Sequence, residues 1–487
     1  MYQLPERGYI RQVQKTKRIG IDLTEGEIFP QLIRFVLPLL LANFVQQLYN
    51  TVDMMVIGQY VGSIGSNAVS NGGQIATLIT FIATAFGSAG QIYVSQLYGA
   101  KNHRAINETL ATALILMMGM SLAFTAVCLV LCRQMLGWIN CPQEAFAQAE
   151  SYMLVVSLGL PAVFGYNMVC GILRGMGEAK RPLLFITVAA VSNVILDLLL
   201  VAVIPLGVTG TAIATIAAQY MSFGAAAVYL YRRRKQFDLK ISRKTIKVSK
   251  VHLKALLQLG IPLTAQTSLI HVSLLICTGL INAFGLVAST TNSIGNHITK
   301  LANIFTSSIN QGAGAMMGQN IGAKKYHRVR KILYVTLCCS LVCGLIASAI
   351  VILFPGEVYG LFLTSTDENY EAILELGIVY LRYHVIVFIL SAIQGAYQSV
   401  VTGTGNAKLG MIAGLLDGVV LRLGFSFLLA YTAGMDVEGF FLANGLARFG
   451  PILVGAIYYY SGKWKNYDLL KGAEAEAAAE KELEEDV

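Results

Sequence analysis

The chain has 487 residues, of which 55% are hydrophobic and 13% are charged, about half the charged share of an average soluble domain. With a mean hydropathy of +0.62, it is neither a soluble globular domain nor a disordered chain, because disorder needs low hydrophobicity and high charge. A net charge of +9 would suit a nucleic-acid partner in a soluble protein, but in a membrane protein it is first expected in the loops.

Apolar stretches separated by charged breaks predict an all-α integral membrane protein with twelve spans. Barrel strands are shorter and alternate in polarity, so only helices fit stretches of this kind. Several are longer than the roughly 20 residues that a bilayer requires, so we expect tilted or protruding helices. The predicted spans are 29–57, 67–97, 105–134, 145–173, 182–203, 208–231, 253–284, 291–320, 329–354, 371–401, 409–431 and 438–461.

The Lys and Arg residues of the predicted connections lie on one side of the membrane. They occur in the N-terminal segment, with Arg7, Arg11, Lys15, Lys17 and Arg18, and in the even-numbered connections. The odd-numbered connections contain none: 58–66, 135–144, 204–207, 285–290, 355–370 and 432–437. The positive-inside rule therefore predicts a multi-pass protein of the cell membrane with both termini and all even-numbered loops in the cytoplasm. Loop charge accounts for the net charge, so we expect no nucleic-acid partner.

The second half of the chain repeats motifs of the first in the same order. The pairs are Pro38 and Pro262, Gly99-Ala100-Lys101 and Gly322-Ala323-Lys324, Gly175 and Gly403, and Val208 and Val437. Six spans per repeat is an even number, so the repeats are parallel, and two such halves meeting at a central interface are typical of alternating-access transporters. We predict a cytoplasmic N-terminal segment (1–28), an N-lobe (29–231), a basic cytoplasmic linker (232–252), a C-lobe (253–461) and an acidic cytoplasmic tail (462–487).

Two carboxylates lie deep in predicted spans of the N-lobe, where ionisable residues are expensive and usually functional. Helix rise places Asp53 roughly 8 Å and Asp197 roughly 9 Å from the outer surface, with Thr215 near 11 Å and Asn193 near 15 Å. Two adjacent carboxylates cannot both ionise cheaply, so this layer could exchange a proton. Its hard oxygen atoms also suit a small cation. The alternative is a structural role, with each Asp holding neighbouring helices together.

Polar side chains at helical spacing predict wet helix faces that line a substrate cavity. Hydrogen bonding at packed helix seams explains any single one of these residues equally well. The candidates are Gln46, Asn50, Gln219, Asn296, Lys300, Asn303, Gln394 and Gln398.

The C-lobe carries further charges inside predicted spans. Asp417 and Arg422 are five residues apart, about 140° around an α-helix, so we predict that they do not face each other. Lys300 needs a carboxylate or a water-filled cavity, and we predict Asp417 as its partner. Pro38 removes a backbone hydrogen bond from the first span, so it is a candidate hinge or a packing residue.

Motifs of soluble enzymes are absent from the sequence, including HExxH, the GxxxxGK[ST] loop and the GxSxG elbow. We therefore predict a transporter rather than an enzyme, with no cofactor. Without a nucleotide site, the energy source should be an ion gradient, and the only metal we expect is a possible Na⁺ at Asp53, Asn193, Asp197 and Thr215.

Residues 28–463 resemble the multidrug and toxic compound extrusion (MATE) family. The resemblance rests on the two parallel repeats and on four stretches: Leu48-Tyr49-Asn50-Thr51-Val52-Asp53, Gln96-Leu97-Tyr98-Gly99-Ala100-Lys101, Arg174-Gly175-Met176-Gly177 and Asn193-Val194-Ile195-Leu196-Asp197. It implies two six-helix lobes that open outward and inward in turn, and export of cationic, amphiphilic organic compounds in exchange for H⁺ or Na⁺.

Within the family, the chain resembles the bacterial branch whose cation site is in the N-terminal lobe. This likeness implies coupling roles for Asp53, Asn193, Asp197 and Thr215, and matches Pro38 to a first-span proline associated with bending on protonation. Another branch has acidic residues in spans seven and ten, where this chain has Ile270-His271 and Gln394 to Gln398. No C-lobe Na⁺ site of that type is therefore predicted.

These observations predict a secondary antiporter that exports small organic compounds through the lipid bilayer as a monomer. The alternative is a flippase of a related type that moves a lipid-linked substrate. The basic residues of the C-lobe keep that alternative open.

Overall fold

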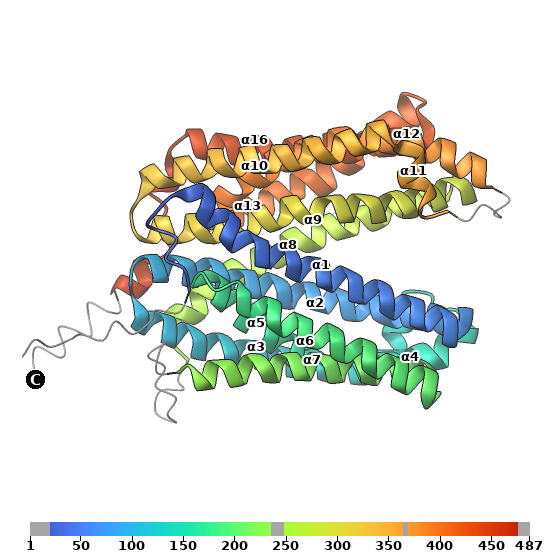
Figure 1. Cartoon of the computed structure of the whole chain (residues 1–487), viewed down its shortest axis with the longest axis horizontal. Helices are drawn as coiled ribbons and strands as arrows, with labels where there is room; N and C mark the ends of the chain where they lie inside the picture. The colour runs from blue at the N-terminus through green and yellow to red at the C-terminus, as the bar shows by residue number, and fades with distance from the viewer. Residues whose placement is uncertain (1–19, 235–247, 364–368, 476–487) are drawn as a thin grey trace, which may run out of the picture.

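The computed structural model describes residues 20–234, 248–363 and 369–475, and in these ranges the chain forms helices and no strand (Figure 1). Helices satisfy every backbone polar group internally, as a lipid environment requires. The first half contains α1 (Ile28–Tyr60), α2 (Gly62–Gly99), α3 (His103–Trp138), α4 (Gln143–Ser157), α5 (Leu160–Gly175), α6 (Lys180–Asp197), the π-helix η1 (Leu198–Val203) and α7 (Gly207–Arg232).

The second half follows the same order of long helices. It contains α8 (Lys250–Asn282), α9 (Leu286–Gly322), α10 (Tyr326–Leu353), α11 (Pro355–Gly360), α12 (Tyr370–Thr404), α13 (Ala407–Leu415), the π-helix η2 (Leu416–Leu423), α14 (Gly424–Phe427), the π-helix η3 (Leu428–Thr432), α15 (Asp436–Leu446), α16 (Phe449–Tyr460) and the short 3-10 turn η4 (Lys463–Lys465).

Ten helical stretches of the described chain are long and apolar enough to cross a membrane, and the bent pair α4–α5 adds an eleventh. Helix α9 has 37 residues, but it carries a row of polar side chains that includes Asn296, Lys300 and Asn303. It is therefore too polar to be recognised by hydropathy alone, although it is long enough to span. The structure is compatible with the twelve predicted spans.

Two of the predicted spans are interrupted rather than continuous. The fourth bends by 47° between α4 and α5, and Pro161 follows the bend in the first turn of α5. The last span breaks between α15 and α16, and Pro451 lies in the first turn after that break. Proline has no backbone N–H to donate to the preceding turn, so a continuous helix is disfavoured at both places.

The helices pack in two groups, α1–α7 and α8–α16, which lie one above the other in Figure 1. Helix α2 packs against α8 and α9 of the second group, and α1 also packs against α9. Residues 20–27 and 463–475 lie at the same end of the molecule, which we call the terminal end.

Residues 20–26 form a strap across the terminal end of both groups. The Ile21 N–H donates to the Gly177 carbonyl of the first half at 3.1 Å. The Leu23 N–H donates to Gln319 Oε1 at 3.0 Å, and Lys325 Nζ donates to the Thr24 carbonyl at 3.0 Å. The strap therefore joins the two halves through side chains and backbone of both.

Several predicted segments lie partly or wholly outside the described residues. These are the basic N-terminal residues up to Arg18, most of the predicted linker (232–252), and the acidic end of the tail. The first part of the predicted tail is packed against the protein: Trp464 and Leu470 are buried, and Trp464 Nε1 donates to the Tyr459 carbonyl at 3.1 Å.

Candidate functional site

Helices α1 and α6 bring two carboxylates together in the half of the molecule away from the terminal end. Asp53 of α1 lies beside Asp197 of α6, and Asn193, one turn before Asp197, also contacts it. Both α6 residues are buried, with 3% of Asn193 and 1% of Asp197 exposed. Helix α6 packs against both α1 and α7, and this packing holds the cluster at a seam of three helices.

The oxygen atoms of this cluster lack hydrogen-bond donors. Asp53 Oδ1, both carboxylate oxygens of Asp197 and Asn193 Oδ1 are buried and find no partner within the described chain. On the neighbouring helix α7, the same holds for Thr211 Oγ1. Buried polar atoms are nearly always hydrogen-bonded, so a cluster whose carboxylate oxygens lack donors fits a proton or a small hard cation, which prefers oxygen ligands.

Two tyrosines near the carboxylates were not identified from the sequence. Tyr49 lies one turn before Asp53 on α1, and Tyr152 of α4 lies within electrostatic reach of both carboxylates. Helical spacing alone could have identified Tyr49, but nothing in the sequence links Tyr152 to residues so distant along the chain. Thr215, the predicted fourth member, is half-buried one turn beyond Thr211, and the described contacts link it to neither carboxylate.

In the described part of the chain, no group of three or more His, Cys, Asp or Glu residues is placed to hold a metal ion. An ion at the α1–α6 cluster would therefore have two carboxylates at most, and its remaining ligands would be amide or hydroxyl oxygens.

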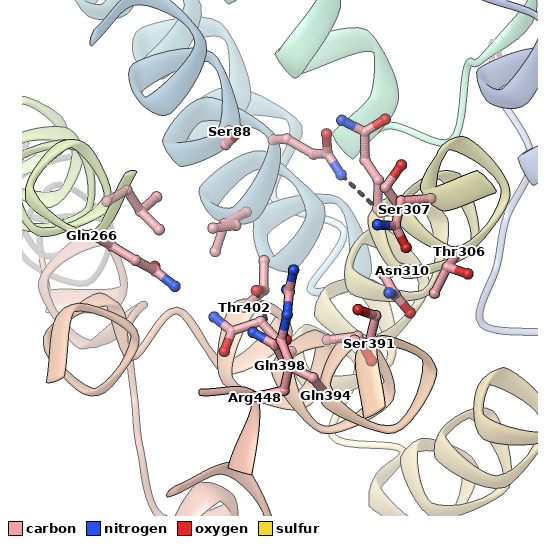
Figure 2. Close-up of a pocket in the computed structure, with 17 residues that line it drawn as sticks. Ser88, Gln266, Thr306, Ser307, Asn310, Ser391, Gln394, Gln398, Thr402 and Arg448 are labelled. Carbon is pink, nitrogen blue, oxygen red and sulfur yellow. Dashed lines mark hydrogen bonds between the residues drawn. The ribbon is translucent and has the colours of Figure 1, made fainter. Parts of the chain in front are cut away.

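A central cavity of about 530 Å³ lies between α2, α8, α9 and α12, within the range of small-molecule sites. Its 17 lining residues are mostly Ser, Thr, Asn and Gln (Figure 2). Among the predicted cavity residues, Asn303, Gln394 and Gln398 line it. The cavity therefore draws on both helix groups and is polar without being rich in charge.

The other predicted cavity residues lie elsewhere. Asn296 lines a second pocket of only about 20 Å³, room for about one water molecule. Lys300 is exposed on α9. Gln46 and Asn50 on α1 and Gln219 on α7 line neither cavity.

The predicted separation of Asp417 and Arg422 is wrong. Arg422 Nη2 donates to Asp417 Oδ1 at 2.5 Å, and both side chains are almost fully buried. The segment is the π-helix η2 rather than an α-helix, and in a π-helix residues five apart are one hydrogen-bonded turn apart. The predicted pairing of Lys300 with Asp417 is also wrong, because the two oxygens of Asp417 face Arg422 and Gln394.

Arg448 lies in the cavity wall and was not among the predicted site residues. It occupies the break between α15 and α16, and its Nη1 donates to Gln394 Oε1 at 2.9 Å. Gln394 Nε2 in turn donates to Asp417 Oδ2 at 3.4 Å. An ionisable residue inside a predicted span is a functional candidate by default, so the sequence did contain a signal for Arg448.

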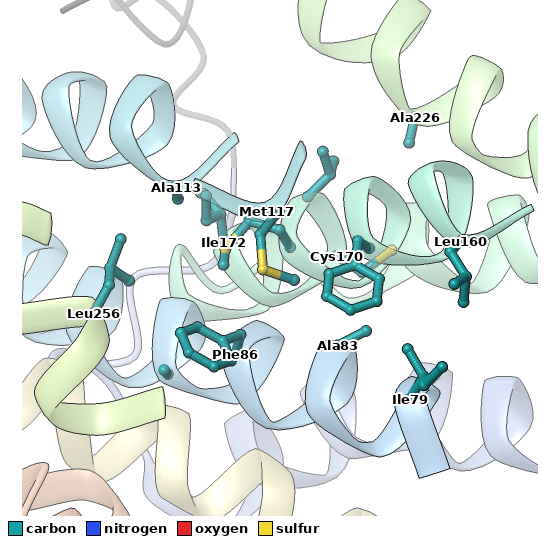
Figure 3. Packing of buried hydrophobic residues seen from close by; sticks show 14 of the residues in the cluster. Ile79, Ala83, Phe86, Ala113, Met117, Leu160, Cys170, Ile172, Ala226 and Leu256 are labelled. Carbon is teal, nitrogen blue, oxygen red and sulfur yellow. The ribbon is translucent and has the colours of Figure 1, made fainter. Parts of the chain in front are cut away.

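A close-packed apolar cluster supports the α2 side of the cavity. Phe86 of α2 lies two residues before the lining residue Ser88, and it packs in the same cluster as Met117 of α3 and Leu256 of α8 (Figure 3). A Cβ added at Gly260 of α8 would lie 2.5 Å from the Phe86 ring, so a larger residue there would force the two helices apart. Helix α8 is thus fixed to the first helix group beside the cavity.

Comparisons with known proteins agree on one family. A family model described as MatE matches residues 38–199 and 262–428. The "Probable multidrug resistance protein YpnP" of Bacillus subtilis (strain 168) is 25% identical over 447 residues, which cover 91% of this chain and 97% of that protein. The "Multidrug export protein MepA" of Staphylococcus saprophyticus is 20% identical over 399 residues, which cover 82% of this chain and 86% of that protein.

Solved structures share the fold. One described as "Outward-facing conformation of a multidrug resistance MATE family transporter of the MOP superfamily" superposes with a TM-score of 0.84 at 20% identity, and the match covers 93% of this chain and 99% of that one.

Proposed function

Because this chain belongs to the multidrug and toxic compound extrusion (MATE) family of membrane transporters, we propose that it exports small organic compounds in exchange for H⁺ or Na⁺. The family consists of transporters rather than enzymes, and the similar proteins are named for multidrug resistance and export. The observation that carries the coupling proposal is the cluster of buried oxygens without donors at Asp53 and Asp197.

A proton or Na⁺ at this cluster would remove the cost of placing two carboxylates together in a low-dielectric region. A structural role for the pair would instead require donors from neighbouring helices, and both oxygens of Asp197 lack them in the described chain. The bound ion therefore stabilises one packing arrangement of α1 and α6, and release of the ion favours a different packing arrangement of these two helices. Such differential stabilisation is what couples an ion to alternating access.

The terminal end is the closed, cytoplasmic end in this proposal. Hydrogen bonds between the halves, such as Gln96 Nε2 to the Gly403 carbonyl at 2.7 Å and Gln319 Nε2 to the Gly175 carbonyl at 2.9 Å, lie there. The described turns between α2 and α3, α5 and α6, α9 and α10, and α12 and α13 also lie at that end (Figure 1), and Lys101, Lys180 and Lys324 of the predicted cytoplasmic loops lie in or directly next to three of them. The monomeric state and the lobe boundaries stay predictions.

The family resemblance predicts cationic amphiphilic cargo. Asn303, Gln394 and Gln398 in the cavity wall supply amides for the polar part of such a molecule. A flippase for a lipid-linked substrate is the second candidate, and Arg448 in the cavity wall favours it because an arginine is suited to binding a phosphate.

Transport into everted membrane vesicles tests the proposal. We expect a fluorescent amphiphile to be taken up when either a pH gradient or a Na⁺ gradient is imposed, and the effective gradient names the ion. Asp197→Asn should abolish gradient-driven uptake while the protein still inserts. Asp436→Asn is the matched control, because Asp436 is exposed at the start of α15 in the second helix group and its positive φ is one that Asn also tolerates.

Undiminished uptake by Asp197→Asn would refute coupling at this cluster. Failure of both gradients to drive any probe, with the protein correctly inserted, would refute ion-coupled export and leave the flippase as the function to test.

A further inference from the structure

We propose that the central cavity binds its cargo through an oxyanion, a carboxylate or phosphate group, that pairs with Arg448. This inference rests on the proposed transport function and adds the chemical class of the cargo. It differs from the cationic cargo that the family resemblance predicts.

The charge of the cavity wall is the first observation. Arg448 is the one ionisable side chain among the 17 lining residues, and none of them is an Asp or Glu. A cationic cargo would therefore meet a positive charge and no carboxylate in the wall. An anionic group would supply the charge that the wall lacks.

The nearest carboxylate is already occupied. Asp417 forms its ion pair with the fully buried Arg422 at 2.5 Å and accepts a second hydrogen bond from Gln394. Arg448 does not contact Asp417 and lies only within its electrostatic reach. Two guanidinium groups thus have one carboxylate near them, which leaves one positive charge uncompensated beside the cavity. A charge held in a low-dielectric region without a counter-charge is costly, and a bound anion would remove that cost.

The guanidinium of Arg448 also has donors to spare. Its one hydrogen bond within the described chain runs from Nη1 to Gln394, and its buried Nε has no partner there. Arginine presents five N–H donors in a planar fork that matches carboxylate and phosphate oxygens. An arginine that served only to hold α15 and α16 together would be expected to use those donors on protein acceptors.

Side-chain amides surround this guanidinium. Figure 2 shows Arg448 next to Gln394 and Gln398, with Gln266 facing them from α8. No described hydrogen bond occupies the side-chain amides of Gln266 and Gln398, so their NH₂ groups are available to an oxyanion.

Binding of three matched probes to the purified full-length protein tests the inference. The probes are an eight-carbon chain with a dansyl group at one end and a carboxylate, a neutral amide or a trimethylammonium group at the other. We expect the carboxylate to bind at least tenfold more tightly than the amide, a difference of about 1.4 kcal/mol, and the trimethylammonium probe to bind most weakly.

Arg448→Gln should remove the preference, so that the carboxylate and amide probes bind the variant with similar affinity, whereas Arg448→Lys should keep part of the preference because the charge remains. Gln398→Leu provides a second variant that does not alter the charge network, and it should weaken carboxylate binding severalfold. Equal binding of carboxylate and amide by the wild type, or an unchanged carboxylate preference in Arg448→Gln, would overturn the proposal.

Competition distinguishes the two sources of an oxyanion. Displacement of the carboxylate probe by a polyprenyl phosphate, but not by short organic carboxylates, would assign the group to a lipid-linked substrate. The reverse result would assign it to a small organic acid. Vesicles that transport the trimethylammonium probe, with no effect of Arg448→Gln, would refute this inference and leave ion-coupled export standing. Carboxylate binding that depends on Arg448, without gradient-driven transport, would support this inference and refute ion-coupled export.

Discussion

Gln96 and Gln319 make reciprocal hydrogen bonds between the two halves of the molecule. Gln96 Nε2 of α2 donates to the Gly403 carbonyl of α12 at 2.7 Å, and Gln319 Nε2 of α9 donates to the Gly175 carbonyl of α5 at 2.9 Å. The two glutamines precede Gly99 and Gly322 by three residues each, and Gly175 and Gly403 are also repeat equivalents. The sequence repeat therefore builds a two-fold related pair of contacts at the terminal end.

Replacing either glutamine by alanine should loosen the terminal end. Each change leaves a buried glycine carbonyl without its donor, at a cost of about 1–3 kcal/mol. Hydrogen exchange of residues 92–99 and 315–323 should become faster in Gln96→Ala and in Gln319→Ala. The control is Gln134→Ala, since Gln134 is exposed on α3. Unchanged exchange in both variants would mean that other contacts hold this end closed.

Replacing Gly99 or Gly322 with alanine should also destabilise the terminal end, because the added Cβ would overlap with the backbone of the facing helix. A Cβ at Gly99 would lie 1.9 Å from the Gln319 carbonyl oxygen, and one at Gly322 would lie 2.0 Å from that of Gln96. Backbone atoms cannot rotate away, so we expect a loss of about 1–3 kcal/mol, typical of overpacking. The measurement is the midpoint of thermal unfolding in detergent.

Gly119→Ala is the matched control for this steric prediction. Gly119 lies within α3 with nothing within 4 Å of its Cβ position, and alanine is favoured over glycine in a helix by roughly 0.5–1 kcal/mol. A midpoint that falls equally in Gly119→Ala and Gly99→Ala would show that close approach of α2 and α9 is not the cause.

Acid should loosen the N-terminal strap through Asp22. Burial raises the pKa of this carboxyl, but hydrogen bonds from the Thr24 side chain and backbone N–H, together with Lys325 and Lys101, lower it below its usual value overall. Because the pKa is lower in the folded than in the unfolded state, ionised Asp22 stabilises the fold at a pH above the unfolded-state pKa of about 3.9. This stabilisation is lost as the pH falls through the folded-state pKa. Protection of residues 20–26 against hydrogen exchange, taken relative to the intrinsic rate at each pH, should therefore decrease below about pH 4.

Asp22→Asn should remove this acid dependence, because an amide does not titrate. The strap of the variant should exchange faster than that of the wild type at neutral pH, and the difference should shrink in acid. A strap whose exchange has the same pH profile in both proteins would contradict a role for Asp22.

Breaking the Asp417–Arg422 pair should be strongly destabilising. Removing one partner of a buried ion pair leaves an uncompensated charge and costs about 3–5 kcal/mol, so Arg422→Met should lower the thermal midpoint sharply. Arg422→Met combined with Asp417→Leu should recover part of the loss, because the carboxylate that lost its hydrogen-bonded partner is then removed as well. The exposed pair Arg104–Glu108 is the control, and Arg104→Met should change stability by less than about 1 kcal/mol.

The sequence alone predicted the membrane class, the spans and the internal repeat. Lipid imposes a local rule, since each crossing segment must be long, apolar and helical whatever its neighbours are. The deep positions of Asp53 and Asp197 followed from the same rule, because counting residues along a helix locates depth. The span at 291–320 was predicted from the breaks on either side of it, although α9 is too polar to be recognised by hydropathy alone.

The tertiary structure decided which polar groups meet. The pairing of Asp417 with Arg422 depends on a π-helix, whose i→i+5 bonding is not visible in residue spacing. The reciprocal contacts of Gln96 and Gln319, and the uncompensated charge of Arg448, depend on where residues hundreds of positions apart are placed by helix packing. A sequence specifies the polarity and depth of each side chain through local rules, but the partner of a buried polar group is set by the register and spacing of whole helices.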